Sequence, residues 1–399
     1  MNRVLFSLLI ALLIAACAPI EQLVLTDAHE PAATQTLTAS QAAPQSIPAP
    51  ENTPLPDEIN APLVDAPSII NIEMVDEIYG WGTTEQNLIR TNDGGVTWYH
   101  VTPPGMSEVG YSVTTEFLDV SHAWVQAVDP DHYPRGGTLY RTSDGGITWE
   151  AFATPFSDGD MEFVDTNNGW MMAGLGVGAG SMAVSIFQTN DGGETWDQVY
   201  TNDPNLKGAG ETLPLGGLKG MLVPLNMQTA WVGGVIYSSG SVYLFRTDDA
   251  GETWFKISLA LPGEAQASEL SIEELVFVSP TQGFLAIRMS SVKMQTIFYA
   301  TNDGGDTWSL APVTLPGAGR LEILSAQEII FYSDDRFYVT KDAGSTFSII
   351  PPDIAFGELV TDMSFANSST GWVVTTDLIN NRTLYKTIDG GLTWYPIIP

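Results

Sequence analysis

From Ile69 to the C-terminus, short runs of apolar or alternating residues recur, and each run is bounded by Gly, Asn or Asp. One stretch shows four of them, at Met161–Val164, Gly169–Ala173, Val184–Gln188 and Thr195–Tyr200. Each run has the length of a strand and is rich in β-branched and aromatic residues, and no window sustains helical spacing. The pattern therefore predicts repeats of four short antiparallel strands.

The turn between the third and fourth runs is spelled almost identically in seven copies, of which RTNDGGVTW (90–98) is the first. The central acids of the seven copies are Asp93, Asp144, Asp191, Asp249, Asp303, Asp342 and Asp389. Their spacing of roughly 40 to 60 residues is typical of solenoids, propellers and arrays. Seven units of four strands predict an all-β, seven-bladed β-propeller over residues 69–399. The alternative, an open β-solenoid, would leave a free sheet edge at each end.

The repeated turn contains residues suited to holding a tight hairpin. An Asp carboxylate accepts hydrogen bonds from backbone N–H groups that follow it, and the Gly after it can adopt a positive φ. The aromatic residues that close the seven turns are Trp98, Trp149, Trp196, Trp254, Trp308, Phe347 and Trp394. We expect these carboxylates to be structural, because single acids repeated around a ring lack the paired geometry of glycoside hydrolysis and the dense oxygen ligands of a calcium loop.

The remaining tryptophans also have a regular place. They stand near the start of the second strand, where the fifth repeat has Phe284 instead, and they are Trp81, Trp124, Trp170, Trp231 and Trp372. Every tryptophan is therefore assigned to the scaffold. None is left over to form a stacking platform for a sugar.

The pattern Thr-x-Asp-x-Gly-x-Thr-Trp resembles the Asp-box, or BNR repeat, of sialidases, sortilin-type receptors, xyloglucan-degrading enzymes and photosystem II stability/assembly factors. The stretch EFVDTNNGW…IFQTNDGGETW is most similar to the assembly-factor family. This resemblance covers residue 69 to the C-terminus and implies the propeller fold. It also implies a role in protein binding, although that family binds reaction-centre protein through an arginine-rich patch, and this chain shows no cluster of arginines.

The N-terminus differs in composition from the repeats. Residues 1–16 have one basic residue and an apolar run that is typical of a secretory signal peptide. The following Cys17 is the only cysteine, and IAAC resembles the bacterial lipoprotein signal, in which this cysteine is lipidated; a plain signal peptide, cleaved or uncleaved, is the alternative. Residues 17–68 are rich in Ala, Pro, Thr and Ser and are expected to form a disordered tether. We therefore expect an exported, lipid-anchored protein on the extracytoplasmic side of a membrane, at the cell surface or in the periplasm.

The charge and the polar residues exclude several classes of function. With 15 basic and 47 acidic residues, the net charge of −32 disfavours nucleic acid as a partner. The four histidines, His29, His100, His122 and His132, show no metal-ligand spacing, so neither a metal nor a cofactor is expected. No nucleophile elbow or P-loop occurs, and no catalytic residue is assigned. Sialidases place three arginines in the central channel, whereas Arg90, Arg141 and Arg246 are expected at the ends of third strands.

Strand topology predicts where binding residues lie. In a four-stranded meander the seven Asp turns share one face, so the long connections lie on the opposite face, where binding loops are expected. These connections are Gln126–Gly137, Gly174–Ser181, Thr201–Gly220, Gly263–Ser271 and Arg288–Gln295. Gly174–Gly180 (GLGVGAG) lacks the helix of a dinucleotide site and is expected to be a flexible loop. The candidate partner-binding residues are Asp129, Asp131, His132, Tyr133, Arg135, Lys207, Lys219, Arg288 and Lys293; plain solvated loops are the alternative.

The sequence thus predicts a monomeric, membrane-tethered propeller that serves as a binding or assembly scaffold for a protein. A carbohydrate-active enzyme, either a glycoside hydrolase or a sialidase-like protein, is the rival hypothesis. A third hypothesis is the capture of a small ligand at the mouth of the central channel.

Overall fold

The computed structural model describes residues 60–106, 108–110 and 113–397. This part of the chain contains 28 strands and two short 3-10 helices, Gly263–Ala267 (η1) and Gly357–Leu359 (η2). It contains no helix that is both long and apolar enough to span a bilayer. The predicted signal peptide, Cys17 and the tether up to residue 59 lie outside the described residues.

Consecutive strands form antiparallel groups of four in chain order, and we call each group a blade. Blade 1 contains β1 (Asn71–Met74), β2 (Gly80–Thr83), β3 (Leu88–Thr91) and β4 (Tyr99–His100). Blade 2 contains β5 (Val113–Phe117), β6 (Ala123–Val128), β7 (Gly137–Thr142) and β8 (Glu150–Thr154). Blade 3 contains β9 (Gly159–Phe163), β10 (Gly169–Gly178), β11 (Ser181–Thr189) and β12 (Asp197–Thr201). Blades 4 and 5 contain β13 (Leu218–Pro224), β14 (Ala230–Val235), β15 (Tyr243–Thr247) and β16 (Phe255–Lys256); β17 (Glu269–Phe277), β18 (Gly283–Ser290), β19 (Met294–Thr301) and β20 (Ser309–Pro316). Blades 6 and 7 contain β21 (Arg320–Ile323), β22 (Ile329–Ser333), β23 (Arg336–Thr340) and β24 (Ser348–Ile350); β25 (Val360–Phe365), β26 (Gly371–Thr376), β27 (Arg382–Thr387) and β28 (Tyr395–Pro396).

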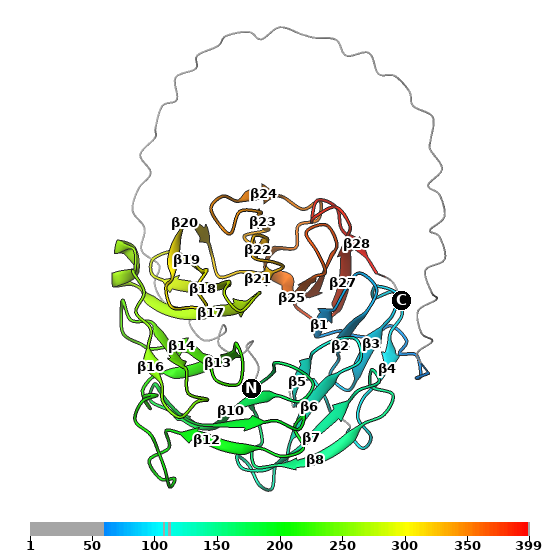
Figure 1. The fold of residues 1–399 in the computed structure, drawn as a ribbon. Helices are drawn as coiled ribbons and strands as arrows, with labels where there is room; N and C mark the ends of the chain where they lie inside the picture. Colours follow the sequence, from blue (N-terminus) through cyan, green and yellow to red (C-terminus); the bar gives the residue numbers. More distant parts are fainter. Residues whose placement is uncertain (1–59, 107, 111–112, 398–399) are drawn as a thin grey trace, which may run out of the picture. The chain divides into compact units, whose positions relative to one another are not determined.

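The blades lie around a common centre. Their first strands, such as β1, β17 and β25, face the centre, and fourth strands such as β8 and β20 lie outside (Figure 1). Blades 4 and 5 are joined into one eight-stranded sheet by a single residue pair, Val235 and Ser271. The fold is therefore an all-β propeller built from four-stranded antiparallel groups.

Blades 1 and 7 are in direct contact without exchanging a strand. The backbone N–H of Ile72 donates to the Asp362 carboxylate at 2.8 Å, and that of Met74 donates to the Ser364 hydroxyl at 2.9 Å. The Trp372 indole donates to the Gly94 carbonyl at 2.9 Å. Side chains of the last blade thus satisfy backbone groups of the first, which excludes the open solenoid.

The tryptophans of the second strands join neighbouring blades. Their rings are fully buried, and three of the indole N–H groups donate to a backbone carbonyl of the next blade: Trp81 to Asp119 (2.9 Å), Trp124 to Gly192 (2.9 Å) and Trp170 to Asn226 (3.2 Å). Trp231 differs, since its Nε1 is buried without a partner among the described residues, although its ring stacks on Phe277.

Two of the predicted loops are wrong. Strand β10 continues to Gly178 and β11 begins at Ser181, so most of GLGVGAG is an extended hairpin. Only Ala179 and Gly180 form its turn, both with positive φ, as a two-residue hairpin turn requires. Likewise, Arg288 lies within β18 and only residues 291–293 connect it to β19. In both segments, pairing with a neighbouring strand satisfies the backbone hydrogen-bonding groups, even though Gly has a low strand propensity.

Residues 62–64, which the sequence assigns to the tether, pair along the outer edge of blade 1. Leu63 bridges Tyr99 in antiparallel orientation, and the His100 N–H donates to the Pro62 carbonyl at 2.7 Å. Ile69 and Ile70 are buried. The packed part of the chain therefore begins several residues before 69.

Trp372→Phe and Trp231→Phe form a matched test of the indole bonds. Both variants lose the same atoms from a buried ring, but only Trp372→Phe leaves a carbonyl, that of Gly94, without its donor. We expect Trp372→Phe to cost about 1–3 kcal/mol more in free energy of unfolding than Trp231→Phe. Urea denaturation measures both values, and equal losses would show that the indole bond adds nothing.

Candidate partner-binding face

The seven repeated turns use both carboxylate oxygens internally. In the first, Asp93 Oδ1 accepts from the Thr91 hydroxyl and the Thr97 N–H, both at 2.9 Å, and Oδ2 accepts from the Thr97 hydroxyl at 2.7 Å. The same three bonds recur at Asp144, Asp191, Asp249, Asp303, Asp342 and Asp389. Hydrogen bonds from Thr307 and Thr301 lower the pKa of Asp303 to about 2. Such carboxylates close turns and are poorly suited to proton transfer.

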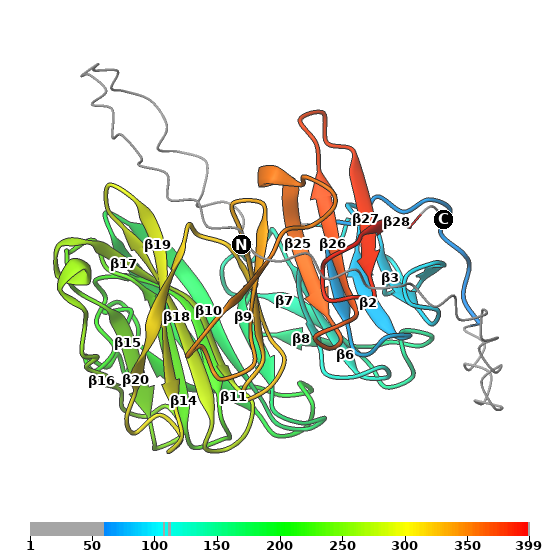
Figure 2. The same ribbon diagram turned by 90° about the horizontal axis from the view of Figure 1, so that it is seen from above.

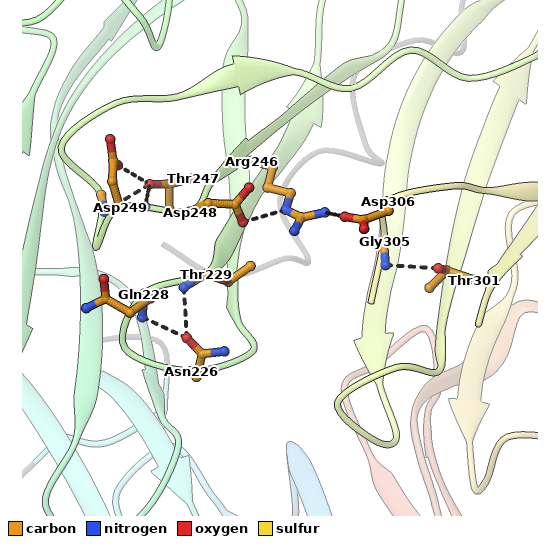
Figure 3. Close-up of polar contacts among 11 residues, drawn as sticks. Asn226, Gln228, Thr229, Arg246, Thr247, Asp248, Asp249, Thr301, Gly305 and Asp306 are labelled. Carbon is orange, nitrogen blue, oxygen red and sulfur yellow. Dashed lines mark hydrogen bonds and ion pairs between the residues drawn. The ribbon is translucent and has the colours of Figure 1, made fainter. Parts of the chain in front are cut away.

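Basic side chains next to these turns connect blades on the same face. Arg246 of β15 donates to Asp248 at 2.8 Å and reaches Asp306, in the turn of blade 5, at 2.6 Å (Figure 3). Arg141 donates to the Asp191 carbonyl at 2.7 Å, and Arg90 donates to the Gly145 carbonyl at 3.4 Å. These arginines lie at third-strand positions, as the sequence predicts, and their inter-blade bonds are a role that sequence reasoning missed.

The opposite face, which we call the loop face, contains the β2–β3-type hairpins and the connections between blades; Figure 2 shows the β26–β27 hairpin at its upper edge. Two connections that the sequence singles out separately meet there. Arg135 is in loop 129–136 of blade 2, and Asp203 is in the connection between blades 3 and 4. The Arg135 Nη2 atom lies 3.9 Å from Asp203 Oδ2. In the same loop His132 Nδ1 lies 2.7 Å from Asp129 Oδ2, while the Tyr133 ring is largely exposed. Asp131 is exposed beside them.

A small cavity of about 100 Å³ lies beneath these two loops, and we call it the slot. Its walls are mainly apolar and come from blades 2 and 3 and the connections next to them. Its lining residues include Arg135, Phe156, Leu175, Ser185, Phe187 and Leu206. An apolar cavity with a few polar groups is the usual form of a binding pocket.

The other predicted contact residues are divided between exposed and buried positions. Lys207 is exposed next to Leu206 at the slot, and Lys293 is exposed in the turn of the β18–β19 hairpin. Arg288, in β18, is paired with Glu273 at 3.3 Å. The hairpin therefore places Lys293, but not Arg288, where an incoming surface could meet it.

The prediction that Lys219 contacts a partner is wrong. Lys219 lies in β13 and is only 4% exposed. Its ammonium donates to the carbonyls of Met182 (2.8 Å), Pro214 (2.6 Å) and Leu215 (2.9 Å). Burial lowers the pKa of Lys219 to about 8. The hydrogen bonds to carbonyl oxygens act in the opposite direction, because they favour the charged ammonium. Because strands alternate their faces, the side chain turns inward and fastens connection 202–217 to blade 3.

Large apolar side chains are exposed at the hairpin tips of the loop face. They are Tyr133 in blade 2, Val177 in blade 3, Tyr237 in blade 4, Val292 in blade 5, and Leu378 and Ile379 in blade 7, and each is at least 54% exposed. The tips of blades 3 and 4 are neighbours, since the Tyr237 ring lies against Gly180. Several apolar tips on one face are a feature of interaction surfaces.

A wider, open depression of about 420 Å³ lies on the loop face where blade 7 meets blade 1. Arg382 lines it and is already held by the Ser68 hydroxyl at 3.3 Å and the Glu85 carboxylate at 3.4 Å. The cation that this depression could offer to a ligand, the Arg382 guanidinium, is therefore already bonded to two side chains of the protein itself.

Carboxylates of the first strands meet near the centre, and sequence reasoning missed them. Burial, together with the charges of Glu73, Asp362 and Glu274, raises the pKa of Glu322 to about 8, against a bond from the Phe365 N–H. Burial raises the pKa of Asp362 to about 6, opposed by its bond from Ile72. A sequence signal existed: in blades 1, 2, 3 and 6 the first strand has Glu directly before its last apolar residue.

No group of His, Cys, Asp or Glu within the described ranges has an arrangement that could hold a metal ion. The acids near the centre bond instead to the backbone of the next blade. Asp160, for example, accepts from the Leu222 N–H. Acids bonded in this way link the first strands of neighbouring blades.

Neither a protein-family model nor a curated protein matches this sequence. Solved structures are similar in fold. YCF48 bound to a D1 peptide is 16% identical with a TM-score of 0.50, and the match covers 86% of this chain and 99% of that one. YCF48 from Cyanidioschyzon merolae is also 16% identical, with a TM-score of 0.50 over 82% of this chain and 97% of that one.

A GH74 xyloglucanase from Xanthomonas campestris is 12% identical, with a TM-score of 0.57 over 82% of this chain. The match covers 54% of the xyloglucanase, so this chain corresponds to about half of that enzyme. At such low identities, these similarities show the propeller fold, which proteins of different function share.

Lys219→Met should loosen connection 202–217, because it removes the ammonium while its carbonyl acceptors stay. We expect a loss of about 2–3 kcal/mol in the free energy of unfolding, as is usual for hydrogen bonds to a charged group. Hydrogen exchange should become faster in residues 202–217. Lys207→Met, at an exposed position of the same connection, is the control and should change neither quantity.

Glu322→Gln should change the pH dependence of stability. The folded chain keeps the proton of Glu322 up to about pH 8, whereas the unfolded chain releases it near 4.5. The folded state thus binds more protons between these values, and stability falls as the pH rises through this window. Glu322→Gln should remove that fall, so it should stabilise the protein at pH 8 and have little effect at pH 4.5. Urea midpoints measure this, with the exposed Glu211→Gln as a control; a fall of equal size in both variants would contradict the assignment.

Proposed function

We propose that this chain is a membrane-anchored, extracytoplasmic propeller that binds a protein partner on its loop face and serves as an assembly scaffold. The observation that carries the proposal is the row of exposed apolar side chains on the hairpin tips of that face, from Tyr133 to Ile379. Rigid strands hold these tips in place, and exposed apolar groups on a rigid scaffold are suited to protein binding.

The opposite face is less suited to a partner that needs free polar groups. There the Asp carboxylates bond within their turns, and Arg141 and Arg246 bond to neighbouring turns. YCF48, which shares the fold, is known bound to a D1 peptide, so a propeller of this kind can hold a polypeptide. The identity of the partner of this chain does not follow from that similarity.

The proposal includes the lipid anchor at Cys17 and the tether that follows it. An anchor and a tether would keep the propeller near membrane-associated partners and raise their effective concentration. Loss of labelled palmitate and release from membranes in a Cys17→Ala protein would support this part, and unchanged labelling would exclude it.

A carbohydrate-active enzyme is the second candidate. The feature that favours it is the pair Glu322 and Asp362 near the centre, since burial raises the pKa of Glu322 to about 8 and that of Asp362 to about 6, and glycosidases use one protonated and one ionised carboxyl group. Release of reducing ends from xyloglucan by the purified protein, lost in Glu322→Gln, would favour the enzyme over the scaffold.

Photo-crosslinking tests the scaffold. With benzoylphenylalanine at Val292 or Tyr237, we expect capture of a membrane protein from the native envelope. Val96, an exposed apolar residue on a repeated turn of the opposite face, is the matched control and should capture none of it. Capture at Val96 equal to that at the tips, or no capture from either face, would overturn the proposal.

A further inference from the structure

We propose that the slot between blades 2 and 3 receives one apolar side chain of a protein partner, next to an acidic residue that bonds Arg135. This inference rests on the proposed function and deepens it. It names the anchor that the partner inserts and the charge that accompanies it.

The size of the slot selects a single side chain. Its volume is about 100 Å³, and a buried cavity of about 150 Å³ holds benzene. Phe156, Phe187, Leu175 and Leu206 supply apolar walls. A Leu, Ile or Met side chain fits such a space, whereas a Trp side chain is too large.

The slot is lined by one buried hydroxyl group whose hydrogen-bonding capacity is not used. Ser185 is 1% exposed and lines the slot, and its Oγ has no hydrogen-bond partner among the described residues. It lies in β11, where its strand neighbours are Ala173 and Thr201. An unpaired buried hydroxyl is costly, so an occupant that offers a backbone polar group beside its apolar side chain would relieve this cost.

Arg135 supplies the charge at the edge of the slot. Its side chain is 57% exposed, and its distance of 3.9 Å from Asp203 makes a long ion pair. Exposed ion pairs of this kind stabilise little, so the guanidinium can turn to a carboxylate of the partner without a large loss. The guanidinium binds a carboxylate with two parallel bonds, which favours Asp or Glu next to the inserted residue.

The competing explanation is a slot that holds only water. Ser185, Gln198 and Arg135 could bond ordered water, and such a slot would not distinguish a Leu side chain from an Ala side chain. A direct test therefore compares these side chains in short peptides.

The probe is an N-acetylated, C-amidated tetrapeptide, Gly-Leu-Asp-Gly, added to full-length protein with labelled leucine methyl groups. We expect the methyl signals of Leu175 and Leu206 to shift, with binding in the millimolar range. Replacement of Leu by Ala in the peptide should weaken binding about tenfold, as for an apolar side chain lost from a pocket. Replacement of Asp by Lys should weaken it by a similar factor. No shift, or equal shifts with the Ala peptide, would overturn the proposal.

Two pairs of protein variants complete the test. Ser185→Leu fills the slot and should abolish the shifts, whereas Ser185→Ala keeps the space and should retain them; unfolding midpoints check that both variants fold. Arg135→Gln should remove the preference for Asp over Lys in the peptide, while Lys207→Gln, next to Leu206, should keep it. Binding that survives Ser185→Leu, or an Asp preference lost equally in both charge variants, would contradict the slot.

The slot and the scaffold can fail separately. If Ser185→Leu leaves peptide binding unchanged but crosslinks from Val292 or Tyr237 still capture a partner, the slot proposal fails and the scaffold stands. If no crosslink from the loop face captures a partner, the proposed function fails, whatever the peptides do.

Discussion

The packing of a buried second-strand side chain against the next blade is the interaction on which the rest of this structure depends, and for Trp81, Trp124, Trp170 and Trp372 the indole also donates to a backbone carbonyl of that blade. A four-stranded sheet of short strands has two faces to cover and cannot be stable alone. The second-strand tryptophans cover one face and also satisfy carbonyls in the turn regions of the neighbouring blade. Because each bond needs the neighbour to be present, the blades stabilise one another and the ring needs no shared strand to close.

The same constraint makes the two faces of the propeller different. The repeated turns receive the indole bonds of Trp124 and Trp372 and the bonds of the arginines, and their carboxylates are used within the turn. Their sequence is therefore restricted in every blade. The hairpins and connections of the loop face have no such task, so they differ in length, and apolar tips such as Val177 and Val292 can be exposed there. The length and the residues of the loop-face segments can therefore differ from one blade to the next.

The slot is a consequence of this freedom at a junction between blades. Loop 129–136 and connection 202–217 belong to different blades and meet through Arg135 and Asp203. One end of the connection keeps its position because the Lys219 ammonium donates hydrogen bonds to the carbonyls of Pro214 and Leu215. The other end of the connection carries the ion pair and Leu206, and Arg135 and Leu206 both line the mainly apolar slot. Packing requirements of the scaffold and the form of the proposed binding site are therefore linked.

The sequence by itself determined the repeat, the four-strand unit, the turn with its Asp, Gly and aromatic residue, and the regular positions of the tryptophans in the second strands and the repeated turns. These follow from local bonds and from the two-residue alternation of strands, which depend on near neighbours only. Tertiary structure alone decided that Lys219 is buried, that GLGVGAG continues a hairpin, and that Glu322 lies among other carboxylates. It also decided that Arg135 meets Asp203. Each of these depends on which distant backbone or charge lies opposite, and a residue's own neighbours in the sequence do not specify that partner.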